Sequence, residues 1–263
     1  MSVGIYFTLG DLGLQQSVAI LLGAAQGGAE LLEIGLPFTD PLLDGPVIQQ
    51  SHLRALKNGE ILWSELCESI IHIQKIYPKV KISLMSSFQL FYEYDRLVQL
   101  PQVDGLLFTD LAYNYSSAQL YAQKNSSEKL NKKRVWFVSQ NLVLSDEFCA
   151  PPEDISMVYM TRIQGTTGAN QSTQDSTAKA IARIKTKTQA PIWLGFGVSN
   201  GSDVKQCLDF GADGAIIGSA FVQHMLNINS KIESSIQSQQ QCDLLNQEAC
   251  KWVQNILFTA QGN

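Results

Sequence analysis

Eight short apolar runs recur along this chain, and segments with helical spacing separate them. Uninterrupted apolar runs of this length are typical of strands buried on both faces, as in parallel sheets. Among the intervening segments, 17–28, 59–78 and 202–211 place apolar residues at helical intervals. The last is expected to begin at a Ser202 cap and to end at Gly211. The apolar runs are GIYFTLG (4–10), AELLEIG (29–35), KISLMS (81–86), DGLLFTD (104–110), RVWFVS (134–139), MVYMTR (157–162), PIWLGFG (191–197) and DGAIIGS (213–219).

A strand followed by a helix, repeated eight times, predicts a (β/α)₈ barrel, the TIM-barrel fold of the α/β class. An open doubly wound sheet is the alternative, but no G-x-G-x-x-G follows the first run. An all-helical chain is a poorer account of PIWLGFG and DGAIIGS. No interior stretch resembles a linker, so residues 1–263 are expected to form a single domain. The glutamine-rich tail, 227–263, ends in an amphipathic segment and is expected to close the fold as a helix.

The amino-acid composition limits the cellular compartment and the classes of binding partner that can be expected. A formal net charge of −5 and a pI near 5.2 argue against nucleic acid or an acidic membrane as partner. The five cysteines are scattered and include no C-x-x-C pair, which indicates neither a disulfide framework nor a zinc site. No signal peptide and no apolar run of membrane-spanning length is read. We therefore expect a cytoplasmic protein.

The carboxyl ends of the strands form the active face of such a barrel, and acids gather there. Glu33 lies inside the second run, where a buried carboxylate needs either a hydrogen-bond partner or a raised pKa. With a raised pKa, it could donate or accept a proton near neutral pH. The alternative is a strand acid paired with a neighbouring hydroxyl. Asp40 and Asp44 follow on the next loop, where acids commonly face water, and Asp110 ends the fourth run.

Glycine-rich loops follow the last three runs: QGTTGAN (164–170), GFGVSNGSD (195–203) and GSA (218–220). Glycines let backbone N–H groups approach phosphate oxygens, and the last loops of this fold are a common phosphate site. A strand-end lysine for a Schiff base is lacking, because Lys81 begins its run. The sequence therefore predicts acid–base chemistry on a phosphorylated small molecule.

The three histidines suggest no metal site. His52, His72 and His224 fall on expected helices and form no ligand cluster. His52 and His72 are predicted to be surface or half-buried residues. We therefore expect no metal ion in the site.

The stretch LLEIGLPFTDPLLDGPVIQ (31–49) resembles the signature of tryptophan synthase alpha subunits, L-E-[LI]-G-x-P-[FY]-[ST]-D-P-x-x-D-G-P-x-I-Q. FTLGD (7–11), GFGVS (195–199) and GADGAIIGSA (211–220) match the ends of the family's first, seventh and eighth strands. The motifs are long and in the right order over nearly the whole chain. The chain is identified as a member of that family.

The resemblance implies a lyase that cleaves indole-3-glycerol phosphate to indole and glyceraldehyde 3-phosphate in tryptophan biosynthesis. It implies no cofactor in this chain; indole passes to a pyridoxal-phosphate-containing beta subunit in an α₂β₂ complex. By the same resemblance, Glu33 is the general acid and base, Asp44 holds the indole N–H, and Asp40 faces the beta subunit. The residues matching the phosphate site are Gly168, Gly197, Gly218 and Ser219, and those matching the indole pocket or its closing loop are Tyr159, Thr167, Phe196 and Leu84.

Three loops depart from the family pattern. LMSSFQLF replaces M-x-Y-x-N-P after the third strand, DLAYNYS replaces the usual D-L/V-P-x-E-E after the fourth, and RIQGTTG puts Ile163 where an arginine is usual. These changes suggest an alternative: a catalytically impaired alpha subunit that mainly binds and allosterically activates the beta subunit. Another phosphate-binding barrel enzyme, from a neighbouring step of tryptophan or histidine synthesis, would be expected to carry a strand-end lysine or an aspartate pair elsewhere.

Overall fold

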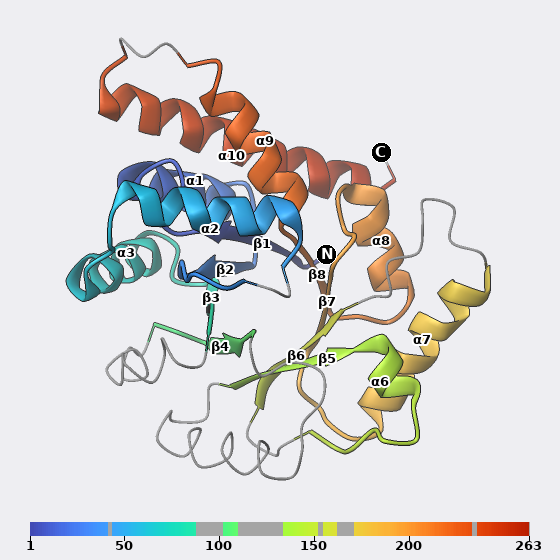
Figure 1. The fold of residues 1–263 in the computed structure, drawn as a ribbon. Coiled ribbons are helices and arrows are strands. Elements are labelled where there is room, and N and C mark those ends of the chain that lie inside the picture. The colour runs from blue at the N-terminus through green and yellow to red at the C-terminus, as the bar shows by residue number, and fades with distance from the viewer. Residues whose placement is uncertain are drawn as a thin grey trace.

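Eight parallel strands close into a barrel in the order β1 to β8, which confirms the predicted fold (Figure 1). The computed structural model describes residues 1–41, 44–87, 102–109, 134–151, 155–161, 171–232 and 236–262. Each predicted apolar run contains or overlaps a strand. The strands are β1 Val3–Thr8, β2 Leu31–Gly35, β3 Lys81–Ser86, β4 Gly105–Phe108, β5 Arg134–Ser139, β6 Ile155–Thr161, β7 Ile192–Gly195 and β8 Gly214–Ile217.

The described helices lie outside the barrel (Figure 1), and most strand residues are buried, with side chains packed inside the barrel and against the helices outside it. In the described part of the chain, no helix is both long and apolar enough to cross a membrane. The helices are α1 Leu14–Gln26, α2 Pro46–Asn58, α3 Trp63–Ile76, α6 Gln140–Leu144, α7 Gln171–Lys185, α8 Gly201–Asp209, α9 Ser219–Asn229 and α10 Ser238–Ala260.

The predicted helical segments 17–28, 59–78 and 202–211 overlap α1, α3 and α8, with differences of up to four residues at their ends. Asn200, not Ser202, caps α8: its side chain accepts a hydrogen bond from the backbone N–H of Asp203 at 3.0 Å. Ser202 already lies in the first turn, and the Asn200 side chain satisfies one of the free N–H donors there. Gly211, with φ of 94°, follows the end of the helix as expected. The glutamine-rich tail forms α10, which confirms the predicted closing helix.

Helix α10 packs across α1, and Gly23 makes this close approach possible (Figure 1). A Cβ atom at Gly23 would overlap the backbone carbonyl of Asn246, whose side-chain amide donates to the carbonyl of Ala19 at 3.0 Å. Backbone on one helix cannot move without shifting the whole helix.

Gly23→Ala is therefore expected to lower the free energy of unfolding by about 2 kcal/mol, measured by urea denaturation. The matched control is Gly45→Ala: its Cβ would meet no atom within 4 Å, and its φ of −68° suits alanine. Equal unfolding midpoints for the two variants would contradict the tight α1–α10 contact.

The register between neighbouring strands determines which side chains enter the barrel. Tyr6 of β1 pairs with Glu33 of β2, and Glu33 pairs with Ser83 of β3. Residues two apart on a strand point to the same face, so Met85 follows Ser83 on the same side. The side chain of Glu33, the third residue of β2, is thereby directed into the barrel.

Candidate active site

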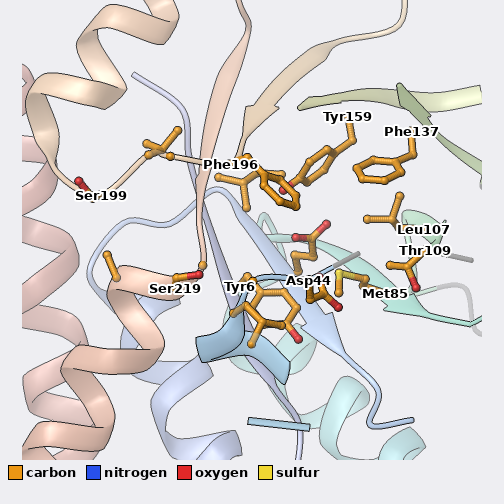
Figure 2. Close-up of a pocket in the computed structure, with 18 residues that line it drawn as sticks. Tyr6, Asp44, Met85, Leu107, Thr109, Phe137, Tyr159, Phe196, Ser199 and Ser219 are labelled. Atoms are coloured by element: carbon orange, nitrogen blue, oxygen red, sulfur yellow. The ribbon is translucent and has the colours of Figure 1, made fainter. Parts of the chain in front are cut away.

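A cavity of about 330 Å³ lies where the strands end. It brings together residues of β1, β2, β3, β4, β5, β6 and β8 with the loops that follow several strands (Figure 2). The described residues that line it are Tyr6, Glu33, Asp44, Gly45, Ile48, Met85, Leu107, Thr109, Phe137, Tyr159, Phe196, Gly197, Val198, Ser199, Ile216, Gly218, Ser219 and Ala220.

Two buried carboxyl groups share this cavity. Glu33 is only 1% exposed, and burial, with a smaller contribution from the charge of Asp44, raises its pKa to about 8. Burial alone raises the pKa of Asp44 to about 7. Within the described part of the chain, neither Oε1 of Glu33 nor Oδ2 of Asp44 has a hydrogen-bond partner. Near neutral pH the pair therefore retains a proton, and it can act as both acid and base.

Asp44 is held at the entrance to α2 by backbone geometry. Its N–H donates to the carbonyl of Pro41 at 3.1 Å, and the Gln49 side chain donates to its carbonyl at 2.9 Å. Pro46 then begins the helix, a position that suits proline because it lacks an N–H. These backbone contacts hold Asp44 directly before α2, where its carboxyl group lines the cavity. Asp40, on the same loop, is exposed and does not line the cavity.

One side of the cavity is aromatic and apolar. Phe137 and Tyr159 meet edge to face with ring centroids 5.3 Å apart, and Phe196 lies beside Tyr159 (Figure 2). Phe196 has φ of 64°, an uncommon conformation for a non-glycine residue. Such strained residues concentrate at ligand sites. Met85 and Leu107 add aliphatic surface, so this side suits a flat, apolar ring.

The other end of the cavity presents backbone N–H groups. Gly218 precedes α9, whose first residue is Ser219, and Gly197, with φ of 75°, lies on the loop after β7. Figure 2 shows Ser199 and Ser219 away from the rings of Phe137 and Tyr159. The free N–H groups of a helix N-terminus and the helix dipole favour a phosphate. The cavity thus has an apolar end, an end at a helix N-terminus that suits an anion, and two carboxyl groups.

The structure brings together most of the predicted site residues. Glu33, Asp44, Tyr159, Phe196, Gly197, Gly218 and Ser219 all line the cavity. Gly168 and Thr167 lie outside the described residues, as do Asp110, Arg162 and Ile163. Leu84 is fully buried but is not among the described lining residues. Leu84 pairs with Ile34, which neighbours Glu33 on β2, so its side chain points to the opposite face of the sheet from Glu33. Met85, the next residue, lines the cavity instead.

Several residues that line the cavity were not predicted from the sequence. Met85, Leu107 and Phe137 could have been found by following alternate positions on β3, β4 and β5. The prediction for His52 was wrong: it is fully buried, because Tyr6 and the backbone N–H of Phe38 supply polar partners. His72 is exposed, in agreement with prediction. Within the described ranges, no three side chains are placed to ligate a metal ion.

Comparisons with known proteins agree with this architecture. The family model described as tryptophan synthase alpha chain matches residues 3–252. The tryptophan synthase alpha chain of Methanothermobacter thermautotrophicus is 31% identical over 224 residues, covering 82% of this chain and 80% of the relative. That of Coxiella burnetii (strain CbuK_Q154) is 32% identical over 230 residues, with 83% and 84% covered.

Solved structures show the same relationship. A chain from a study of the tryptophan synthase α₂β₂ complex of Pyrococcus furiosus superposes with a TM-score of 0.74 at 26% identity, covering 98% of both chains. The alpha subunit of Legionella pneumophila has a TM-score of 0.77 at 20% identity, covering 100% of this chain and 93% of its own, and shares the fold. The chain therefore belongs to the tryptophan synthase alpha chain family, lyases of tryptophan biosynthesis that cleave indole-3-glycerol phosphate.

Proposed function

We propose that Glu33 and Asp44 carry the cleavage of indole-3-glycerol phosphate to indole and glyceraldehyde 3-phosphate in this chain. The observation that carries the proposal is the pair of buried carboxyl groups, without hydrogen-bond partners at Glu33 Oε1 and Asp44 Oδ2 in the described part of the chain, inside one cavity. The aromatic end suits the indole ring, and the α9 N-terminus suits the phosphate. The scissile carbon–carbon bond would then lie between the two ends.

The reaction needs one proton delivered and one removed. Protonated Glu33 donates its proton to C3 of the indole ring, which places positive charge on the ring. The resulting carboxylate then takes the proton from the adjacent glycerol hydroxyl as that carbon becomes the aldehyde and the carbon–carbon bond breaks. Glu33 thus ends protonated, ready for the next turnover. A pKa near 8 allows both transfers near neutral pH.

Asp44 supports the charged intermediate. Its carboxylate would accept the indole N–H and stabilise the positive charge that develops on the ring. Because the charge exists only after C3 is protonated, this interaction strengthens along the reaction. This division of labour needs Asp44 ionised while Glu33 keeps the proton. Burial raises both pKa values, which leaves a proton on the pair near neutral pH.

The partner is proposed to be a beta subunit, in a cytoplasmic α₂β₂ complex. Asp40 is exposed on the loop that also carries Asp44, so contact at Asp40 could be transmitted to the cavity. The Pyrococcus furiosus neighbour comes from a study of such a complex. Pyridoxal phosphate would belong to the beta subunit, and the steps assigned to Glu33 and Asp44 require no cofactor. The retained acid pair favours a cleaving subunit over one that only activates its partner.

Asp44→Asn tests this assignment. The amide oxygen can still accept the indole N–H but carries no charge, so kcat for indole release is expected to fall by about 10²-fold while KM changes by less than about threefold. Asp40→Asn is the control: it should leave indole release by the isolated chain unchanged and weaken stimulation by a beta subunit. Unchanged kcat in Asp44→Asn would contradict its role. If wild type releases no indole yet raises beta-subunit turnover of indole and serine, the purely activating alternative holds.

A further inference from the structure

His52 lies behind the cavity and touches three elements that shape it. Its ring is fully buried on α2 and meets the Phe38 ring edge to face, with centroids 4.9 Å apart. Nδ1 accepts a hydrogen bond from the Phe38 backbone N–H at 3.4 Å, and Nε2 lies 3.1 Å from Tyr6 Oη. Nε2 also faces Asp44 Oδ2 at 3.9 Å. One side chain thus joins β1, α2 and the loop that carries Asp44.

The contacts determine which ring nitrogen carries the proton. Because Nδ1 accepts from Phe38, the proton of a neutral imidazole must reside on Nε2. A charged imidazolium would place a second donor against the Phe38 N–H. Burial disfavours that form too, and lowers the pKa of His52 to about 4. His52 is therefore neutral near neutral pH, with an N–H directed at Tyr6.

A second line of hydrogen bonds leads to the same tautomer. Ser51 Oγ donates to the carbonyl of Ile48 at 2.7 Å, so it must accept from Thr8 Oγ1, 2.6 Å away. Thr8 has then used its hydrogen, and it accepts from Tyr6 Oη at 2.9 Å. Tyr6 in turn must accept from His52 Nε2–H. The series of donors runs in one direction, from the imidazole to a backbone carbonyl.

This direction matters because Tyr6 lines the cavity and is the register partner of Glu33. With its hydrogen directed at Thr8, the Tyr6 hydroxyl has no hydrogen left to donate to a group in the cavity. The His52 N–H also favours the carboxylate of Asp44 through its dipole.

We propose that neutral His52 is a positioning residue of the lyase site, which holds the Asp44 loop through Phe38 and fixes the orientation of the Tyr6 hydroxyl. The inference rests on the proposed roles of Glu33 and Asp44. His52 is not among the described residues that line the cavity, so it acts through Tyr6 and Asp44. Its effect should therefore be larger on kcat than on KM.

Substitutions at His52 separate its two hydrogen bonds. His52→Ala removes both and is expected to lower kcat about 30-fold with KM within about threefold. His52→Asn keeps an acceptor near the Nδ1 position, and His52→Gln keeps a donor near Nε2, so each should retain kcat within about tenfold of wild type. His72→Ala, on the exposed face of α3, is the control and should match wild type. Wild-type kcat in His52→Ala, or equal losses in all three variants, would overturn the proposal.

A measurement on unmodified protein does not depend on whether a variant folds. With only three histidines in the chain, imidazole ¹⁵N shifts can be resolved by NMR. We expect His52 to be neutral at neutral pH with its proton on Nε2. A proton on Nδ1, or a charged ring, would overturn the inference even in an active enzyme. Conversely, the expected tautomer in a protein that releases no indole would refute the proposed function and leave this hydrogen-bond arrangement standing.

Discussion

Glu33→Gln is expected to lower kcat for indole release from indole-3-glycerol phosphate by about 10³-fold. Glutamine has nearly the same shape and remains buried without strain, but it can neither protonate C3 of the ring nor take the hydroxyl proton. Substrate affinity should change little, because the indole and phosphate ends of the cavity are untouched. The measurement is steady-state indole release, with substrate binding followed by calorimetry in the same variant.

The control for this substitution is Glu30→Gln. Glu30 is exposed one residue before β2, at the opposite end of the strand from the cavity, and accepts a hydrogen bond from Ser2 Oγ. It should retain wild-type kcat and KM. A Glu33→Gln variant that keeps its kcat would show that another group transfers the proton, and the assignment of Glu33 would be wrong.

The second large effect is on stability, and it changes with pH. In the unfolded chain Glu33 returns to its ordinary pKa of 4.5, against about 8 in the folded protein. A carboxyl group with a raised folded pKa supports folding fully below the unfolded pKa, and its contribution is lost as pH rises from about 4.5 to about 8. The pKa of Asp44 is raised from 3.8 to about 7, so its contribution to stability is also lost with rising pH, over a lower pH range.

Glu33→Gln removes this loss, so the variant should become more stable than wild type as pH rises. We expect near-equal free energies of unfolding near pH 4.5 and a variant more stable by about 5 kcal/mol near pH 9, from urea denaturation. Glu30→Gln should follow wild type throughout. A constant difference between Glu33→Gln and wild type across this range would mean that Glu33 is ionised normally in the folded protein. The gain in stability and the loss of activity have one origin, the burial of a carboxyl group that lacks a partner at Oε1.

Much of the site could be predicted from the sequence because the barrel rule ties position in the chain to position in space. Glu33, at the end of an apolar run, had to lie near the active face, and a glycine loop before α9 had to lie beside it. Leu84, which the family resemblance places in the indole pocket or its closing loop, is not among the described residues that line the cavity. Which face of β3 enters the barrel depends on register with β2, and a shift of one residue exchanges Leu84 for Met85.

His52 shows a different limit. A histidine on a helix is commonly exposed, and nothing in its local sequence reports that Tyr6, 46 residues earlier, supplies a partner for its ring. Burial of a polar ring depends on partners that meet only after the chain has folded.

The sequence by itself determined the barrel, the family and the principal acids, because apolar periodicity and a long motif are local properties that read directly along the chain. Only the tertiary structure decided that Glu33 and Asp44 share one cavity with raised pKa values. It also decided which strand faces line that cavity and that His52 supports it from behind. Those properties depend on desolvation and on contacts between distant segments, and both arise only when the eight strands close.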